Sequence, residues 1–103
     1  MTDVKFQYNG DRLTIYLMGE IDHHGSFKIK DAIDAHILKY SPHTAVMNFA
    51  GVTFMDSSGI GLVLARYKFC QHTGTSLYVE GVDRQTQRIL SLAGIKFINE
   101  FTV

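Results

Sequence analysis

The stretch FMDSSGIG, residues 54–61, places an acid and two serines directly before an apolar run. The acid and both serines can cap a helix, because their side-chain oxygens accept hydrogen bonds from the free N–H groups of its first turn. A cap alone does not account for Gly59 and Gly61, since each glycine inside a helix costs about 0.5–1 kcal/mol relative to alanine. Glycines keep the surface beside the hydroxyls flat. We therefore expect something large to approach the serines closely.

The residues on either side of this stretch predict a strand and a helix. Residues 45–50, AVMNFA, are nearly all apolar, which is typical of a short strand covered on both faces. Apolar side chains then recur at the spacing of one helical face, which predicts a helix from about residue 58 to residue 71. These apolar positions are Ile60, Val63, Leu64 and Tyr67. The acid and the serines thus lie between a buried strand and a helix.

The N-terminal part of the chain predicts a hairpin. Residues 4–8 and residues 12–18 have the composition of strands, and the turn sequence Asn-Gly-Asp separates them. Gly19 is expected to end the second strand. The polar sequence EIDHHGS, residues 20–26, is then expected to form a loop.

Helices and strands alternate along the rest of the chain. A helix is predicted over about residues 27–40, with Ser41-Pro42 ending it, because proline disfavours a helical residue before it. Its apolar positions are Ile29, Ile33, Ile37 and Leu38. Residues 76–80 predict another strand, and Asp83 is expected to cap a third helix that ends at Gly94 and carries Ile89, Leu90 and Leu92. The tail, IKFINEFTV, is compatible with a last strand or with a short helix.

The predicted order is β-β-α-β-α-β-α-β. Strands that alternate with helices indicate an α/β fold with a mixed, mostly parallel sheet, in which the antiparallel pair is the N-terminal hairpin. No linker, repeat or low-complexity segment divides the chain, so residues 1–103 are expected to form a single domain.

Composition narrows the classes of function. Hydrophobic residues make up 46% of the chain and charged residues 19%, as in ordinary globular proteins. The ten basic and ten acidic residues cancel, which argues against a nucleic-acid partner. One cysteine, no signal-peptide pattern and no apolar run long enough to cross a membrane favour a cytoplasmic protein without a membrane partner.

Two kinds of chemistry are weak candidates. A serine nucleophile on a strand-to-helix elbow needs glycines on both sides, whereas Met55 and Asp56 precede the serines here. His23 and His24 invite a metal site, but no cluster of cysteines or carboxylates completes a set of ligands. We therefore expect no catalytic residue, metal or cofactor, and no enzymatic activity.

Two segments resemble one protein family, and the predicted order of elements agrees with that family along almost the whole chain. They are GEIDHHGS, residues 19–26, and TFMDSSGIGLVLARYK, residues 53–68. With these segments the chain resembles the STAS-domain anti-sigma factor antagonists (anti-anti-sigma factors), most closely those of the sporulation type. The resemblance implies a protein that binds an anti-sigma factor, which is also a serine kinase, and so frees a sigma factor. Phosphorylation by that kinase ends the binding, and a PP2C-type phosphatase restores it.

The resemblance also implies roles for single residues. In the family the serine directly after the aspartate accepts the phosphate, and that serine is Ser57 here. Glu20 and Asp22 are implied as contacts for basic residues of the partner, although either is equally well explained as a solvated loop carboxylate. The other residues expected at the partner surface are Asp56, Ser58, Gly59 and Gly61. A monomer is expected. The alternative is a STAS domain that serves as an accessory or structural subunit of a transporter or signalling assembly, without a sigma cycle.

Overall fold

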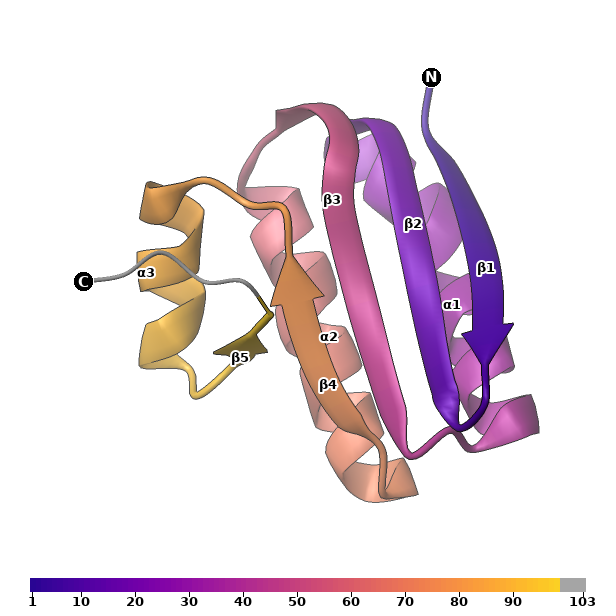
Figure 1. Cartoon of the computed structure of the whole chain (residues 1–103). Helices are drawn as coiled ribbons and strands as arrows, with labels where there is room; N and C mark the ends of the chain where they lie inside the picture. Colours follow the sequence, from indigo (N-terminus) through magenta and orange to yellow (C-terminus); the bar gives the residue numbers. More distant parts are fainter. Residues whose placement is uncertain (99–103) are drawn as a thin grey trace.

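The computed structural model describes residues 1–98, which form five strands and three helices (Figure 1). In chain order they are β1 (Asp3–Asn9), β2 (Arg12–Ile21), α1 (His23–Tyr40), β3 (Thr44–Met55), α2 (Ser57–Thr73), β4 (Ser76–Glu80), α3 (Arg84–Leu92) and β5 (Lys96–Phe97). The predicted order of elements and the mixed α/β fold are confirmed. The tail begins with the short strand β5, and its last five residues lie outside the described part.

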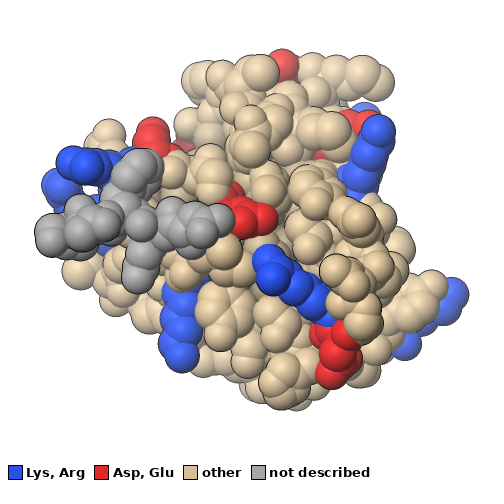
Figure 2. Space-filling model, in the orientation of Figure 1, with Lys and Arg blue, Asp and Glu red and all other residues tan. Residues whose placement is uncertain are grey.

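The described strands form one sheet in the order β1-β2-β3-β4-β5. β1 pairs with β2 as the predicted antiparallel hairpin, and every other neighbouring pair is parallel. The carboxyl ends of β2, β3 and β4 therefore meet at one edge of the sheet, which is at the top of Figure 1. α1 and α2 lie behind the sheet in that view, and the face turned toward the viewer is mostly uncharged in Figure 2.

The hydrophobic core lies between the sheet and these helices. Alternate residues of each strand point into it, and the helices contribute one stripe each. Its members on the strands are Leu13, Ile15, Leu17, Ile21, Ala45, Met47, Phe49, Leu77 and Val79, and those on the helices include Ile29, Ile33, Ile37, Leu62, Val63, Cys70 and Leu90. Burial raises the pKa of the Cys70 thiol to about 11, so this side chain is an apolar core residue at neutral pH.

An ion pair also joins the two helices. Arg66 on α2 is only 8% exposed, and its Nε lies 2.8 Å from Oδ1 of Asp34 on α1. Burial raises the pKa of the Asp34 carboxyl, while the Arg66 guanidinium acts in the opposite direction. Removing Asp34 would leave the buried Arg66 guanidinium without its partner, which is costly, whereas Asp34 is only half-buried. The pair therefore holds α1 and α2 in one relative position.

Three expected boundaries are wrong. β2 does not end at Gly19 but continues to Ile21, and β3 continues five residues beyond the expected end at residue 50, to Met55. The expected loop at residues 20–26 is absent, because α1 already begins at His23. Both strands are therefore longer than predicted, and each leads into its helix through a single aspartate.

Three apolar residues assigned to helix faces are exposed. Leu38 on α1 is 63% exposed, and Ile89 and Leu92 on α3 are 41% and 87% exposed. The buried stripe of α1 instead runs through Ile29, Ile33 and Ile37, four residues apart. Residues four apart lie on nearly the same face of a helix, because four residues make slightly more than one turn. Leu38 directly follows Ile37, so it lies off this face and points away from the sheet. Leu90 is the buried apolar residue of α3.

The fold predicts opposite results for two neighbouring substitutions on α1. Ile33 is completely buried, whereas Ala32 is exposed. Ile33→Asp should abolish cooperative folding, because an unpaired carboxylate cannot be buried without a large cost. Ala32→Asp should change the free energy of unfolding by at most about 0.5 kcal/mol. Urea denaturation followed by circular dichroism measures both. A folded Ile33→Asp protein of unchanged stability would contradict the buried position.

Candidate functional site

The pairing of β2 with β3 brings the starts of two helices side by side. Ile21 is the last residue of β2 and Met55 the last of β3, and the two are partners in the parallel register. Each is followed by one aspartate and then by a helix. His23 and Ser57, the first residues of α1 and α2, are therefore at equivalent places on neighbouring strands. The N-termini of both helices open at the same edge of the sheet (Figure 1).

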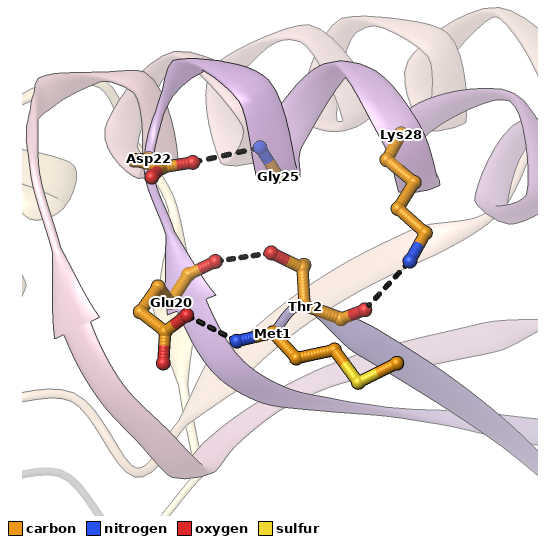
Figure 3. Close-up of polar contacts among 6 residues, drawn as sticks. All are labelled: Met1, Thr2, Glu20, Asp22, Gly25 and Lys28. Atoms are coloured by element: carbon orange, nitrogen blue, oxygen red, sulfur yellow. Dashed lines mark hydrogen bonds and ion pairs between the residues drawn. The ribbon is translucent and has the colours of Figure 1, made fainter.

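An aspartate caps each helix, although the two side chains bond to different N–H groups of the first turn. Oδ1 of Asp22 accepts a hydrogen bond from the N–H of Gly25 at 2.7 Å (Figure 3), and Oδ1 of Asp56 accepts one from the N–H of Ser58 at 2.8 Å. The explanation of Asp22 as a solvated loop carboxylate is therefore wrong, because this side chain holds the start of α1. A role in partner binding stays a prediction for both aspartates.

A glycine follows each cap at the third helical position, where the chain is crowded. A Cβ on Gly25 would collide with Thr2 and with the carbonyl oxygen of Glu20. A Cβ on Gly59 would collide with the side chain of Met55. Gly59 is buried, so its lack of a side chain lets α2 lie close to the sheet, and an approaching partner is not needed to explain it. This explanation by packing applies to Gly59 and not to Gly61.

Gly61 has a different environment. It is exposed, and a Cβ at this position would have no atom within 4 Å. Packing therefore gives no reason for a glycine here, although alanine would suit a helix better. The absence of a side chain leaves the surface of α2 bare one turn after the serines. Gly61 is the glycine that fits the predicted approach of a partner.

Ser57 and Ser58 differ in exposure. Ser57 is exposed and Ser58 is half-buried. Within residues 1–98 the Ser57 hydroxyl takes part in no hydrogen bond, and the cap of α2 is Asp56 rather than either serine. The Ser57 oxygen is thus free to react, and it stands where unpaired N–H groups and the helix dipole favour negative charge.

Glu20 is engaged by the N-terminal residues (Figure 3). Its carboxylate pairs with the amino group of Met1, and its carbonyl oxygen accepts a hydrogen bond from the Thr2 hydroxyl. The Lys28 ammonium in turn lies 3.4 Å from the carbonyl oxygen of Thr2. The segment before β1 therefore fastens the end of β2 to the first turns of α1. Glu20 already has a cationic partner, and its expected contact with another protein stays a prediction.

Other kinds of site find no support in the described residues. No group of three or more histidine, cysteine, aspartate or glutamate side chains is placed to hold a metal ion within residues 1–98. His23 and His24 are both exposed in the first turn of α1. In the same part of the chain no helix is both long and apolar enough to cross a membrane.

Comparison with protein families identifies the family of this chain. The family model of the STAS domain matches residues 3–102. The chain belongs to the STAS family. The family predicted from GEIDHHGS and TFMDSSGIGLVLARYK is thus confirmed, and both helix starts lie within the matched residues.

The chain is similar to several anti-sigma factor antagonists. The chain is 30% identical over 92 residues to the anti-sigma F factor antagonist of Paenibacillus polymyxa, which covers 89% of this chain and 79% of the relative. It is 43% identical to the anti-sigma F factor antagonist of Lysinibacillus sphaericus over a shorter stretch of 58 residues, which covers 56% of this chain and 50% of the relative. An anti-sigma-B factor antagonist of Listeria monocytogenes is 26% identical over 90 residues, 87% of this chain and 78% of the relative.

Solved structures agree with this assignment. The unphosphorylated anti-sigma factor antagonist SpoIIAA superposes with a TM-score of 0.78 at 25% identity, over 98% of this chain and 90% of that one. The Bacillus cell fate determinant SpoIIAA in its phosphorylated form superposes with a TM-score of 0.74 at 25% identity, over 97% and 93% of the two chains. This fold is therefore one in which both states of a phosphoprotein are known.

The two glycines of α2 should respond oppositely to alanine. Gly59→Ala should lower the free energy of unfolding by more than about 1 kcal/mol, because its Cβ overlaps Met55 and forces the helix or the methionine to move. Gly61→Ala should raise it by about 0.5–1 kcal/mol, since open space surrounds the new methyl group and alanine is the better helix former. Chemical denaturation of the two variants tests the assignment, and equal effects would contradict it.

The cap of α1 predicts a loss of stability for Asp22→Ala. The variant should be less stable by about 1 kcal/mol, because the N–H of Gly25 loses its acceptor. Asp31→Ala is the matched control, since Asp31 is exposed on the same helix and pairs with Lys30 at the surface. Urea melts of the two variants should therefore separate. If both have wild-type stability, Asp22 does not hold the helix.

Proposed function

We propose that this chain is an anti-sigma factor antagonist of the sporulation type, switched by phosphorylation of Ser57. The observation that carries the proposal is the exposed, unbonded Ser57 hydroxyl on the first turn of α2, next to the cap made by Asp56. The anti-sigma F and anti-sigma-B factor antagonists among the relatives support it, as does SpoIIAA in its two phosphorylation states. On this proposal the unmodified chain binds an anti-sigma factor and releases the sigma factor.

The position of Ser57 explains how a phosphate could switch binding without unfolding the protein. The anti-sigma factor, acting as a kinase, transfers the γ-phosphoryl group of ATP to the Ser57 oxygen, which loses its proton, and ADP leaves. The phosphoserine carries a charge of about −1.5 to −2 near pH 7. At the N-terminus of a helix that charge is favourable, because free N–H groups and the helix dipole face it. The antagonist itself should therefore remain folded.

The same charge disfavours the complex. Even two single negative charges about 4 Å apart, at an effective dielectric constant near 20, repel each other by about 4 kcal/mol, and the phosphate carries more than one. A penalty of this size weakens binding about a thousandfold. A PP2C-type phosphatase would then restore the binding form by hydrolysing the phosphate ester. We place this cycle in the cytoplasm, with the antagonist acting as a monomer and performing no catalysis itself.

Substitutions at the two serines test the switch. Ser57→Ala should abolish phosphorylation by the cognate anti-sigma factor and ATP but keep binding, since it removes only an exposed hydroxyl. Ser57→Asp should fold normally, because a carboxylate is favourable at a helix N-terminus, yet bind at least about tenfold more weakly. Mass spectrometry measures the phosphate and isothermal titration calorimetry the affinity.

Ser58→Ala is the matched control at the next position. It should still accept one phosphate, because Asp56 and not Ser58 caps the helix. Phosphate on Ser58 in the Ser57→Ala protein at the wild-type rate would move the acceptor by one residue. If none of these proteins binds the anti-sigma factor, the proposed function is wrong and an accessory STAS subunit is favoured instead.

A further inference from the structure

The turn of the N-terminal hairpin contains an asparagine followed directly by a glycine. Asn9 is the last residue of β1, and Gly10 and Asp11 form the turn that leads into β2. The turn lies at the edge of the sheet opposite the helix starts (Figure 1). In an Asn-Gly pair the backbone nitrogen of the glycine can attack the side-chain amide of the asparagine, because the glycine has no side chain to obstruct the approach.

Both reacting groups are exposed and unbonded in this structure. Asn9 and Gly10 are exposed. Within residues 1–98 the side-chain amide of Asn9 takes part in no hydrogen bond, and the N–H of Gly10 has no acceptor. Gly10 has a φ of 62°, and a Cβ at this position would have no atom within 4 Å. Open space therefore surrounds the two groups, and no hydrogen bond restrains either of them.

The residues on both sides of this pair are fastened to other elements. The Tyr8 hydroxyl lies 2.8 Å from Nδ1 of His36 on α1. Oδ1 of Asp11 accepts a hydrogen bond from the N–H of His43 at 3.2 Å. The movable part of the turn is therefore limited to residues 9 and 10.

The peptide plane between Asn9 and Gly10 can turn without moving these anchors. A rotation about ψ of Asn9 is compensated by an opposite rotation about φ of Gly10, and glycine accepts values of φ that other residues avoid. The turn of this plane disturbs the pairing of Asn9 with Arg12, which is the last pair of the hairpin. Such terminal pairs open at little cost in free energy. The attack therefore does not require the protein to unfold.

We propose that Asn9 deamidates in the folded protein by cyclisation onto the backbone nitrogen of Gly10. The nitrogen loses its proton to base and bonds to Cγ of Asn9, the Cγ–Nδ2 bond breaks, and Nδ2 leaves as ammonia. Water then opens the succinimide ring. Cleavage of the ring bond from nitrogen to Cγ gives aspartate. Cleavage of the bond from nitrogen to the backbone carbonyl carbon gives isoaspartate, in which the main chain runs through the former side chain.

Both products change the charge, and isoaspartate also changes the hairpin. Deamidation adds one carboxylate to a chain with ten acidic and ten basic residues, so the net charge falls by one from zero. Isoaspartate lengthens the main chain by one methylene group at position 9. The pairing with Arg12 does not fit this longer chain, so the end of the hairpin should open and the free energy of unfolding should fall. The site is far from Ser57, and the inference does not depend on the proposed function.

Incubation of the purified, folded chain in neutral and mildly alkaline buffers tests the proposal. Ion-exchange chromatography should show a more acidic form that accumulates with time. Mass spectrometry with electron-transfer fragmentation should place aspartate and isoaspartate at residue 9. The rate should rise in proportion to the hydroxide concentration, because the Gly10 nitrogen attacks after losing its proton. Asn9→Gln should lose the acidic form completely, since glutamine would have to close a larger ring.

Asn48 is an internal control in the same chain. Its Nδ2 donates to Oε2 of Glu80 at 2.8 Å, its Oδ1 accepts from the N–H of Ala50 at 2.9 Å, and the bulky Phe49 follows it. It should stay unmodified while Asn9 reacts. If no acidic form accumulates, or if the modified residue is not Asn9, the proposal is wrong. If the acidic form appears in urea but not in the folded chain, the turn protects Asn9 and the proposal is equally wrong.

Discussion

The parallel pairing of β2 with β3 is the constraint on which the site depends. Twice along this pair β3 uses one residue more than β2, between the partners of Tyr16 and Met18 and again between those of Gly19 and Glu20. Such irregularities are common next to functional sites, where they redirect the end of a strand. Despite them the two strands end together at Ile21 and Met55. Two helices therefore start next to each other, and their relative position follows from where the strands stop.

The same local pattern starts both helices, with an apolar strand end, a capping aspartate, two polar residues and a glycine. The aspartates satisfy backbone N–H groups that would otherwise lack a partner, and the glycines allow each helix to lie close against its surroundings. In α1 the two polar residues are His23 and His24, and in α2 they are Ser57 and Ser58. The hydroxyl proposed to accept phosphate is thus placed by a rigid frame, and a change of charge there need not propagate into the sheet.

Much of this fold could be predicted because its periodicity is local. The spacing of Ile29, Ile33 and Ile37 shows which face of α1 is buried, and the turn after Asn9 indicates the hairpin. The ends of the strands could not be predicted, because they depend on contacts far away in the sequence. Gly19 resembles a strand end, yet it lies within β2 at a φ of 84° and directly against the backbone of Met1.

The candidate site could be predicted only where its residues are neighbours in the sequence. Asp56 and Ser57 form one contiguous signal in the sequence, whereas the pairing of the two helix starts depends on the register of two strands. Gly59 was misinterpreted because only the structure reveals Met55 beneath it. What remained hidden in each case was a contact between elements.

The central claim is that a phosphate on Ser57 changes the surface of this protein and not its fold. The most direct test is the amide NMR spectrum of the chain with phosphoserine incorporated at position 57, compared with that of the unmodified chain. The account predicts shifts confined to the first turns of α2 and α1, around Ser57 and His23, with the core strands unchanged. Shifts that spread through β4 and the C-terminal half of α1 would show that the phosphate rearranges the fold and would contradict the account.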